Sequence, residues 1–535
     1  MPAYSSNIAL QVQHRHSLIL GALALLLFIL GEHNQAAIGF DSRFVLFANE
    51  MLRHGPGFFP TTYGQPYPDY SATSTLFIWL LSTPFGQVTS LSAWLPTAIA
   101  SATTVTLTYR LVVPHSRQWA LMSVALLLLS MTFITETRAV SLDQMIAAVS
   151  LGAFYLAYAH DHLAAPRRHV GLLALLVVGF AIRGPIGLVI PAGVLCSYYL
   201  VSGQGRRMFS LGLQALALLL ACIGLLLTLA WISGGQTFVH EVIRMQVTGR
   251  MDGTEGASSV WYYFTRSMGN YALAYPLAAL VLAALLVTGR HPSGAALQLI
   301  KYCVAAGLVV MIGLSIPQAK KARYVLAMLP FAAIIAAYPF QAMHGRVFAL
   351  LRGLIQGLFL LLPGLLIVGL VIARKRFDEQ VPSLEGVFFV LGGLQLLAVG
   401  ALFRAQWRVT GLAGCAVFAV WGTYIMVYEP LERSVYDTRE FTHQALRLID
   451  RTPAPLVLHG MGKDAKAIKF MVNVNRDMSA LFTQTAAELG TINGPAWVVM
   501  DRKDYQRLQG TVLGNTAPVL SARFDKNDYV LLKKP

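Results

Sequence analysis

Two carboxylates stand where predicted membrane helices meet their outer loops. Asp41 follows the first apolar stretch, and Asp143 follows Ser141-Leu142 at the start of another. Each has a purely structural interpretation, because Asp41 suits the N-cap of an amphipathic helix and Asp143 complements the positive end of a helix. If the two carboxylates converge on one cavity, they could instead orient a nucleophile, accept a proton or hold a metal.

A long segment, 233–270, carries charged and aromatic residues together. It contains His240, Glu241 and Arg244, followed by Trp261-Tyr262-Tyr263. Aromatic clusters beside a bilayer are usually interfacial anchors. Arginine, however, matches phosphate oxygens with two parallel hydrogen bonds, so this segment also suits a phosphate group.

Three cations stand close together in Lys320-Lys321-Ala322-Arg323, and Tyr324 follows them. The positive-inside rule does not account for them, because this turn is predicted to lie on the outer side of the membrane. Contact with lipid head groups is one interpretation, and binding of one particular lipid phosphate is the other.

The composition shows what must position these side chains. Hydrophobic residues make up 56% of the 535-residue chain, charged residues only 12%, and the mean hydropathy is +0.58. Soluble domains carry roughly 25% charged residues, so this composition indicates a polytopic α-helical membrane protein. The four cysteines form no CxxC or Cys/His cluster, which argues against structural zinc and a disulfide framework.

About 20 apolar residues cross the bilayer core, and thirteen stretches qualify as candidate spans. They lie near 17–37, 90–112, 119–135, 144–160, 170–184, 185–201, 209–232, 271–289, 296–316, 324–341, 354–373, 386–403 and 409–428. The two stretches that meet at Arg183-Gly184-Pro185 could also be one broken helix. The segment 72–88 is predicted to be a juxtamembrane helix, with a true span as the alternative.

One set of short loops is strongly basic and is predicted to face the cytoplasm. The loops on the other side are longer and mixed in sign. With thirteen spans the two termini lie on opposite sides, so the tail faces a periplasm-like space.

The composition becomes water-compatible near residue 431, which separates a transmembrane domain (1–430) from a tail (431–535). Outer loops 38–89 and 233–270 are predicted to form the site of the first domain. In the tail, apolar stretches at 454–458, 497–500 and 529–532 predict strands, and patterns near 438–450, 463–472 and 478–489 predict helices. The tail is therefore predicted to be a small α/β domain.

In their order and spacing, these features resemble those of the superfamily of lipid A aminoarabinose transferases and protein O-mannosyltransferases. The Asp-Glu-x-Arg-Tyr-like motif of that superfamily reads Asp41-Ser42-Arg43-Phe44 here. Its next stretch reads Gly64-Gln65-Pro66-Tyr67 and is followed by Asp69, which matches an acid. Tyr70 replaces a lysine that resembles a donor-phosphate ligand in the aminoarabinose transferases.

Further matches follow along the chain. Asp143 matches the second aspartate of the superfamily, Arg183-Gly184-Pro185 its Lys-Gly-Pro, and His240-Glu241-Val242-Ile243-Arg244 its Glu-His-x-x-Arg with the first two residues exchanged. Trp261-Tyr262-Tyr263 matches a Trp-Tyr-Tyr sequence, and Tyr324 matches the tyrosine after a basic turn. The resemblance covers nearly the whole chain.

The resemblance implies an inverting GT-C glycosyltransferase that moves one sugar from a polyprenyl monophosphate, such as undecaprenyl phosphate, to an acceptor. Asp41 and Asp143 are the implied catalytic residues. Phosphate ligands would be drawn from Arg43, Arg183, Arg244, Lys320, Lys321, Arg323 and Tyr324. The substrate pocket would include Asp69, Tyr70, Glu241, Trp261, Tyr262 and Tyr263. A divalent metal ion would bind at Asp69 and His240.

The resemblance also implies a bacterial inner-membrane protein whose site faces the periplasm. Its partners would be membrane lipids, the lipid-linked sugar and an acceptor that is a lipid A-like lipid, a surface glycan or a surface protein such as a pilin. No phosphate-binding glycine loop predicts a nucleotide cofactor, and nothing predicts a nucleic-acid partner. Two alternatives are a transporter or flippase of lipid-linked sugars and a non-catalytic membrane receptor.

Overall fold

The computed structural model describes residues 2–39, 41–69, 71–166, 168–252, 256–288, 294–342, 344–376, 384–511 and 513–534. The chain forms two compact units. The helical unit comprises Met1–Leu30, Pro68–Ser74 and Trp94–Met426. The mixed unit comprises Gly31–Tyr67, Thr75–Ala93 and Val427–Pro535. Both therefore combine segments that are far apart in the sequence.

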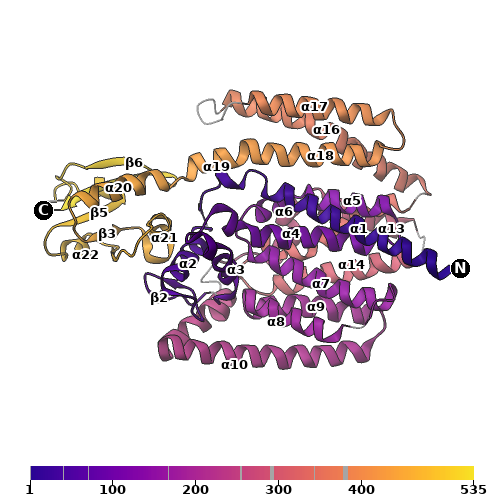
Figure 1. Cartoon of the computed structure of the whole chain (residues 1–535), viewed down its shortest axis with the longest axis horizontal. Helices are drawn as coiled ribbons and strands as arrows, with labels where there is room; N and C mark the ends of the chain where they lie inside the picture. Colours follow the sequence, from indigo (N-terminus) through magenta and orange to yellow (C-terminus); the bar gives the residue numbers. More distant parts are fainter. Residues whose placement is uncertain are drawn as a thin grey trace. The chain divides into compact units, whose positions relative to one another are not determined.

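The helical unit is built from apolar helices connected by short turns (Figure 1). Its main helices are α1 (Pro2–Ile29), α4 (Ser90–Val112), α5 (Arg117–Leu128), α6 (Met131–Thr137), α7 (Leu142–His162), α8 (His169–Arg183), α9 (Pro185–Val201), α10 (Gly205–Ile243), α13 (Ala274–Val287), α14 (Ala295–Ser315), α15 (Leu329–Ala336), α16 (Arg346–Arg376), α17 (Glu385–Leu402) and α18 (Arg408–Thr423). Shorter pieces are η3 (Arg244–Thr248), α11 (Gly249–Met251), α12 (Tyr262–Thr265), η4 (Arg266–Met268), η5 (Ala322–Met328) and η6 (Tyr338–Phe340).

Within this unit the helices form neighbouring groups. In Figure 1, α16, α17 and α18 lie together on one side, where α18 packs against α5, and α10 lies along α9 on the other side. The α9 helix also packs against α7, α8 and α14. The polar turns therefore collect at the two ends of the helices.

Each of the thirteen predicted spans overlaps with one helix or with two or three consecutive helical elements. In the described part, 7 helical segments are long and apolar enough to cross a membrane, and an eighth qualifies if α5 and α6, bent by 69°, form one span. The full number of thirteen crossings stays a prediction. The first predicted span ends too late, because α1 stops at Ile29 and Gly31 turns the chain in a left-handed conformation, with φ 76°.

The segment predicted to be juxtamembrane forms α3 (Thr73–Ser82), which has 10 residues. A helix of that length spans about 15 Å, half of the hydrocarbon core of a bilayer. The alternative of a true span is therefore wrong.

The two apolar stretches that meet at Arg183 are separate helices and not one broken helix. Gly184 has φ 64° and ψ −150°, and it reverses the chain between α8 and α9. The two helices then pack against each other, and a Cβ on Gly179 would overlap with the carbonyl oxygen of Gly187. This close approach keeps Arg183 at the end of a rigid hairpin.

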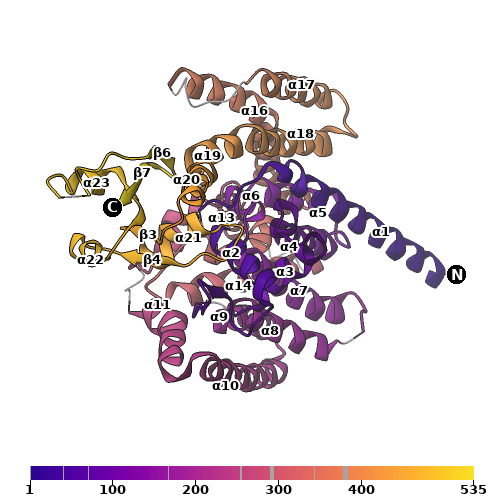
Figure 2. The ribbon, with the colours of Figure 1, turned by 60° about the vertical axis from the view of Figure 1, so that its left-hand side comes forward.

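The mixed unit contains a five-stranded sheet in the order β4-β3-β5-β7-β6. Its strands are β3 (Leu456–His459), β4 (Ala480–Thr483), β5 (Ala496–Asp501), β6 (Leu520–Phe524) and β7 (Asn527–Lys534). β3 pairs in parallel with β4 and β5, whereas β7 pairs antiparallel with β5 and β6. Figure 2 shows β3 and β4 toward one edge and β6 and β7 toward the other.

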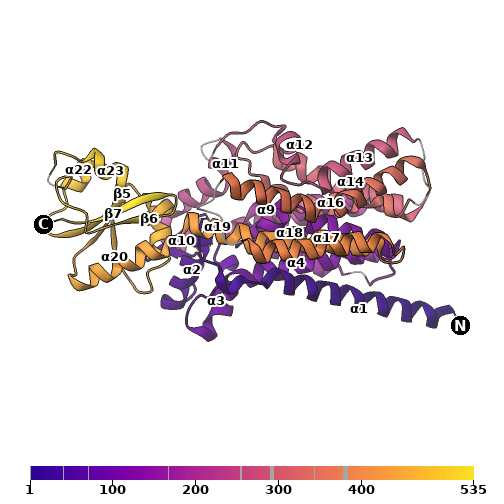
Figure 3. The same ribbon diagram turned by 90° about the horizontal axis from the view of Figure 1, so that it is seen from above.

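Helices cover both faces of this sheet, with α20 on one side and α22 and α23 on the other (Figure 3). These helices are α20 (Arg439–Arg451), α22 (Ala486–Gly490) and α23 (Arg502–Arg507). Phe441 of α20 packs against Phe524 with a ring separation of 5.7 Å. On the opposite face, Leu489 of α22 joins Val498 and Leu532 in a buried cluster. The sheet is therefore enclosed, as expected for parallel strands.

One predicted helix in the tail is wrong. The stretch 478–489 contains the edge strand β4 before the short helix α22 begins. β4 alternates partly buried and exposed residues, and its one neighbour is β3. An amphipathic edge strand of four residues carries too little apolar signal to be separated from a helix by sequence pattern alone.

The remaining elements of the mixed unit come from both ends of the chain. They are η1 (Glu32–Asn34), α2 (Asp41–His54), β1 (Thr61–Thr62), β2 (Gln65–Pro66), η2 (Thr83–Phe85), α19 (Glu429–Tyr436), η8 (Gly462–Lys466) and α21 (Ala467–Met471). The α2 helix packs on α21, which brings the segment with Asp41 into contact with the tail.

Trp421 of α18 offers a test of how the helical unit is held together. Its indole is fully buried, lies 5.0 Å from the ring of Phe28 and donates a hydrogen bond of 3.0 Å to the carbonyl of Leu128. Trp421→Phe leaves that buried carbonyl unpaired and should cost about 1 kcal/mol of stability. We expect a lower Tm by circular dichroism in detergent. Trp407→Phe at an exposed position is the control, and equal Tm values for the two variants would contradict this role.

Candidate functional site

Hydrogen bonds of Ser141 fix the N-terminal end of α7. The hydroxyl of Ser141 accepts from the backbone N–H of Gln144 at 3.2 Å and so caps the helix. The same hydroxyl donates to Glu136, and the N–H of Ser141 donates to the hydroxyl of Thr97 at 3.1 Å. Asp143, in the first turn, therefore has a defined position at the positive end of the helix.

Asp143 forms ion pairs with two arginines from different parts of the chain. One carboxylate oxygen pairs with Arg183 at the α8–α9 turn, and the other lies 3.2 Å from Nε of Arg323 in η5. The side chains of Asp143 and Arg183 are only 9% and 11% exposed. Two guanidinium groups therefore face one carboxylate in a largely buried place.

Aromatic residues enclose this charged group. The guanidinium of Arg183 lies 4.8 Å from the ring centre of Tyr324. Tyr263 is fully buried, and its burial, together with nearby Tyr324, raises the pKa of its phenol well above the ordinary value. Tyr263 therefore stays neutral. We call Asp143, Arg183, Arg323 and Tyr324 the Asp143 cluster.

Hydrogen bonds from side chains to backbone carbonyls hold the basic turn before Tyr324 in place. The phenol of Tyr271 donates to the carbonyl of Ala322 at 2.7 Å. The ammonium of Lys320 donates to the carbonyls of Ser258 and Pro317 at 3.2 and 2.5 Å, and its burial lowers its pKa. Lys320 therefore binds the loop backbone, and Lys321 is the exposed cation of the turn.

Gln246, which was not among the predicted site residues, connects two more predicted site segments. The side-chain amide of Gln246 donates to the backbone carbonyl of Asp69, and its own oxygen faces Gly184. Ser71 donates to the carbonyl of Ala181 in α8. The segment that carries Asp69 is thus attached to the α8–α9 turn. Gln246 lies two residues after Arg244, but its residue type gave no chemical signal in the sequence.

Several other predicted residues are exposed. His240, Glu241 and Arg244 are exposed, and so is Trp261, whereas Tyr262 packs edge-on against Tyr263 at 5.2 Å. None of the four exposed residues has a described hydrogen bond or ion pair to the Asp143 cluster. Tyr70 lies outside the described residues.

The predicted metal ligands differ in exposure. Asp69 is buried and His240 is exposed. Among the residues that the structure describes, no group of three His, Cys, Asp or Glu side chains could hold a metal ion. A divalent metal ion at Asp69 and His240 stays a prediction, and we assign no step to one.

Asp41 and Arg43 belong to the mixed unit. Asp41 is buried and is the first residue of α2, where a negative charge complements the helix dipole. Arg43, two residues on, donates to the backbone carbonyl of Asp464 at 3.0 Å and lies 5.2 Å from the ring centre of Tyr67. The tail of the chain therefore helps to orient the residues beside Asp41.

A second unpredicted residue, Glu50 of α2, shapes the same region. Its carboxylate accepts hydrogen bonds from the backbone N–H groups of Tyr63 and Gly64, at 2.6 and 3.3 Å. This holds the β1–β2 hairpin in place, and the phenol of Tyr63 donates to the carbonyl of Lys463 at 2.9 Å. Glu50 is buried, so its role is to support the loop that carries the Gly-Gln-Pro-Tyr motif.

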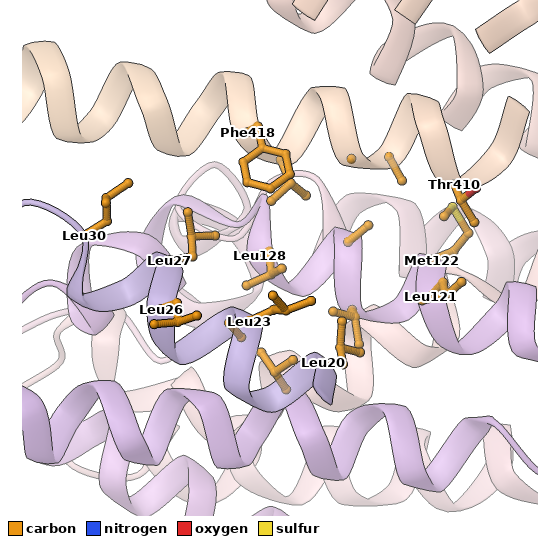
Figure 4. A pocket seen from close by; sticks show the side chains of 17 residues that line it. Leu20, Leu23, Leu26, Leu27, Leu30, Leu121, Met122, Leu128, Thr410 and Phe418 are labelled. Carbon is orange, nitrogen blue, oxygen red and sulfur yellow. The ribbon is translucent and has the colours of Figure 1, made fainter. Parts of the chain in front are cut away.

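An apolar pocket of about 490 Å³ also lies in the helical unit, between α1, α5 and α18 (Figure 4). Leucines from α1 and α5 line it, together with Phe418 of α18, and Thr410 supplies a hydroxyl at one end. No charged side chain is among the described residues that line it. The pocket suits hydrocarbon and offers no group that could carry out acid–base chemistry.

Comparison with known proteins gives the class of this protein and its fold. A family model described as dolichyl-phosphate-mannose-protein mannosyltransferase matches residues 72–232. The matched stretch includes Asp143 and Arg183 of the Asp143 cluster. The family model describes glycosyltransferases, and the prediction that this chain is one is confirmed at the level of class.

Solved structures give the fold. ArnT from Cupriavidus metallidurans bound to undecaprenyl phosphate matches with a TM-score of 0.69 and 15% identity, over 96% of this chain and 97% of that chain. ArnT in the apo state matches with a TM-score of 0.71, the same identity and the same coverage. No curated protein matches by sequence. The resemblance stated from the sequence is therefore confirmed, and the chain has the ArnT fold.

Gly184 tests how tightly the α8–α9 turn is constrained. Its φ and ψ lie in a region that only glycine adopts readily, and a Cβ would come within 2.8 Å of the side-chain oxygen of Gln246. We expect Gly184→Ala to cost about 1–3 kcal/mol of stability. Gly86→Ala, where φ is also positive but the surroundings are open, should cost about 1 kcal/mol. Thermal unfolding in detergent measures both, and a smaller loss at Gly184 than at Gly86 would contradict the constraint.

Proposed function

We propose that this protein transfers one sugar, with inversion, from a polyprenyl monophosphate donor to an acceptor at the periplasmic surface of a bacterial inner membrane. The observation that carries the proposal is the Asp143 cluster, in which two partly buried guanidinium groups share one carboxylate. Two such cations held side by side fit a phosphate that gains charge during the reaction.

The lipid phosphate is the leaving group of the proposed reaction. When the bond between the sugar and the lipid phosphate breaks, negative charge grows on the phosphate. Cations that are already oriented stabilise that charge without a reorganisation cost, and they act more strongly where water is excluded. Asp143 holds Arg183 and Arg323 in fixed directions, and Tyr324 adds a phenol beside Arg183.

Two comparisons support a polyprenyl phosphate as the carrier of the donor sugar. The matching family model is described by a dolichyl phosphate-linked sugar, and one matching ArnT structure contains undecaprenyl phosphate. Both are polyprenyl phosphates. The proposed further phosphate ligands are Arg43, Arg244, Lys320 and Lys321, and the proposed pocket for the sugar and acceptor includes Asp69, Tyr70, Glu241, Trp261, Tyr262 and Tyr263.

The proposed general base is Asp41, which would accept a proton from the acceptor hydroxyl, while Asp143 would act by orienting the arginines. Asp41 is buried at 9% exposure, and α2 places it at a positive helix end. The proposed topology has thirteen spans, with the tail in the periplasm. The acceptor is proposed to be a lipid A-like lipid, a surface glycan or a surface protein.

Asp41→Asn tests the base. Removal of the proton acceptor should lower transfer from a labelled polyprenyl phosphate sugar by about a hundredfold or more. The control is Glu440→Gln, which neutralises an exposed carboxylate on α20 of the same unit. Both variants should accumulate in the membrane at the wild-type level. Product formation by Asp41→Asn at the wild-type rate would refute the assignment.

Arg244→Ala tests phosphate binding outside the Asp143 cluster. Loss of one guanidinium contact should raise KM for the lipid-linked donor by about tenfold, with a smaller change in kcat. Arg266→Ala removes another exposed arginine of the same loop region and should leave KM unchanged. The measurement is the initial transfer rate against donor concentration in detergent. An unchanged donor dependence in Arg244→Ala would remove this residue from the site.

The sugar and the acceptor can be identified together. Lipid A, surface glycans and surface proteins from cells with and without this protein are compared by mass spectrometry. We expect one class to lose the mass of a single sugar. If a lipid-linked sugar instead accumulates on one side of the membrane while every class stays unchanged, the transporter alternative is favoured.

A further inference from the structure

The other end of α7 carries a second carboxylate, Asp161, whose side chain is 12% exposed. Asp143 and Asp161 lie near opposite ends of this 21-residue helix, about 27 Å apart along its axis. Asp161 is therefore remote from the Asp143 cluster. It lies at the end of the bundle that the positive-inside rule predicts to be cytoplasmic.

A closed hydrogen-bond network surrounds Asp161. Its carboxylate accepts from the phenol of Tyr198 and the side-chain amide of Gln204, each at 2.8 Å, and pairs with Arg207 at 2.9 Å. Arg207 also donates to the side-chain oxygen of Gln204 at 2.6 Å. The charge of Asp161 is thus compensated inside the protein, and it holds the α9–α10 turn in one conformation.

This network forms the floor of a polar cavity of about 690 Å³. The cavity is lined by Asp161, His162, the turn 202–205, Arg206, Arg207 and Tyr302. α10 begins at Gly205 within this lining, and the side chain of Gln204 does not cap it. The N–H groups of the first turn of α10 are therefore available to a ligand, and they carry the positive end of the helix dipole.

Tyr302 of α14 is an independent sign of a ligand. It is 7% exposed and lines the cavity. Its hydroxyl has no hydrogen-bond partner among the residues that the structure describes, although its ring packs against Tyr198 and His162. The hydroxyl can therefore donate a hydrogen bond to a ligand in the cavity without giving up a partner within the described protein.

Three kinds of hydrogen-bond donor face this cavity. They are the first N–H groups of α10, the exposed guanidinium of Arg206 and the hydroxyl of Tyr302. With Asp161 balanced by Arg207, Arg206 gives the cavity a net positive charge. An anion with several acceptor oxygens satisfies all of these donors, and a phosphate group has that chemistry.

The surroundings favour a lipid as the source of the phosphate. Directly after the cavity, α10 presents exposed apolar residues along one stripe. Phe209, Leu213, Leu216 and Leu220 are 73%, 60%, 52% and 62% exposed. Hydrocarbon chains could lie against this stripe while their head group occupies the cavity. We propose that the cavity between the ends of α7, α9, α10 and α14 binds the phosphate head group of a membrane lipid, separately from the proposed transfer site.

The experiment uses the purified full-length protein after removal of bound lipid by detergent exchange. Dioleoylphosphatidylglycerol, dioleoylglycerol and inorganic phosphate are added separately, and Tm is measured by circular dichroism. Phosphatidylglycerol should raise Tm of the wild type by about 3 °C, because a ligand that binds the native state stabilises it. Dioleoylglycerol and inorganic phosphate should each give less than half of this shift.

The variants identify the site. Arg206→Ser and Tyr302→Phe should each lose at least half of the shift with phosphatidylglycerol, and Tyr302→Phe preserves the packed ring. Arg117→Ser is the control, because Arg117 is an exposed arginine at the same end, near the contact of His115 with Tyr158 at 3.0 Å. Equal shifts in all four proteins would overturn the proposal. A full shift with inorganic phosphate would overturn the lipid as the ligand.

Discussion

Neutralisation of the Asp143 carboxylate is the constraint on which most of the described arrangement depends. A carboxylate at 9% exposure inside an apolar bundle is expensive unless it is paired and hydrogen-bonded. Its two partners come from the α8–α9 turn and from η5, so both turns must meet at the start of α7. The glycine at 184 makes the first turn possible, and the contact of Tyr271 with Ala322 fixes the second.

In this arrangement one residue orients the charged side chains, and other residues supply the charge. Asp143 holds two arginines, and the arginines supply the positive charge. A phosphate that approached them would find cations with fixed directions, because Tyr324 and Tyr263 fill the space around Arg183. Rigid packing around charged groups is what electrostatic stabilisation of a transition state requires.

The mixed unit uses backbone contacts for a similar purpose. Arg43 and Tyr63 bind the carbonyls of Asp464 and Lys463, and Glu50 holds the β1–β2 hairpin. These contacts join a loop near the N-terminus to a domain near the C-terminus. Removal of the tail should therefore disturb the surroundings of Asp41 even though the tail supplies no predicted catalytic side chain.

The sequence by itself determined the membrane class and the positions of the apolar helices, and it marked Asp143, Arg183 and Tyr324 as candidates, because apolar periodicity and rare charges are visible without a fold. Tertiary structure decided which of the charges meet. It brought Arg323 to Asp143, placed Gln246 between Asp69 and Gly184, and left His240, Glu241 and Arg244 exposed. The physical reason is that pairing of buried charges depends on contacts between turns distant in sequence, which local patterns do not encode.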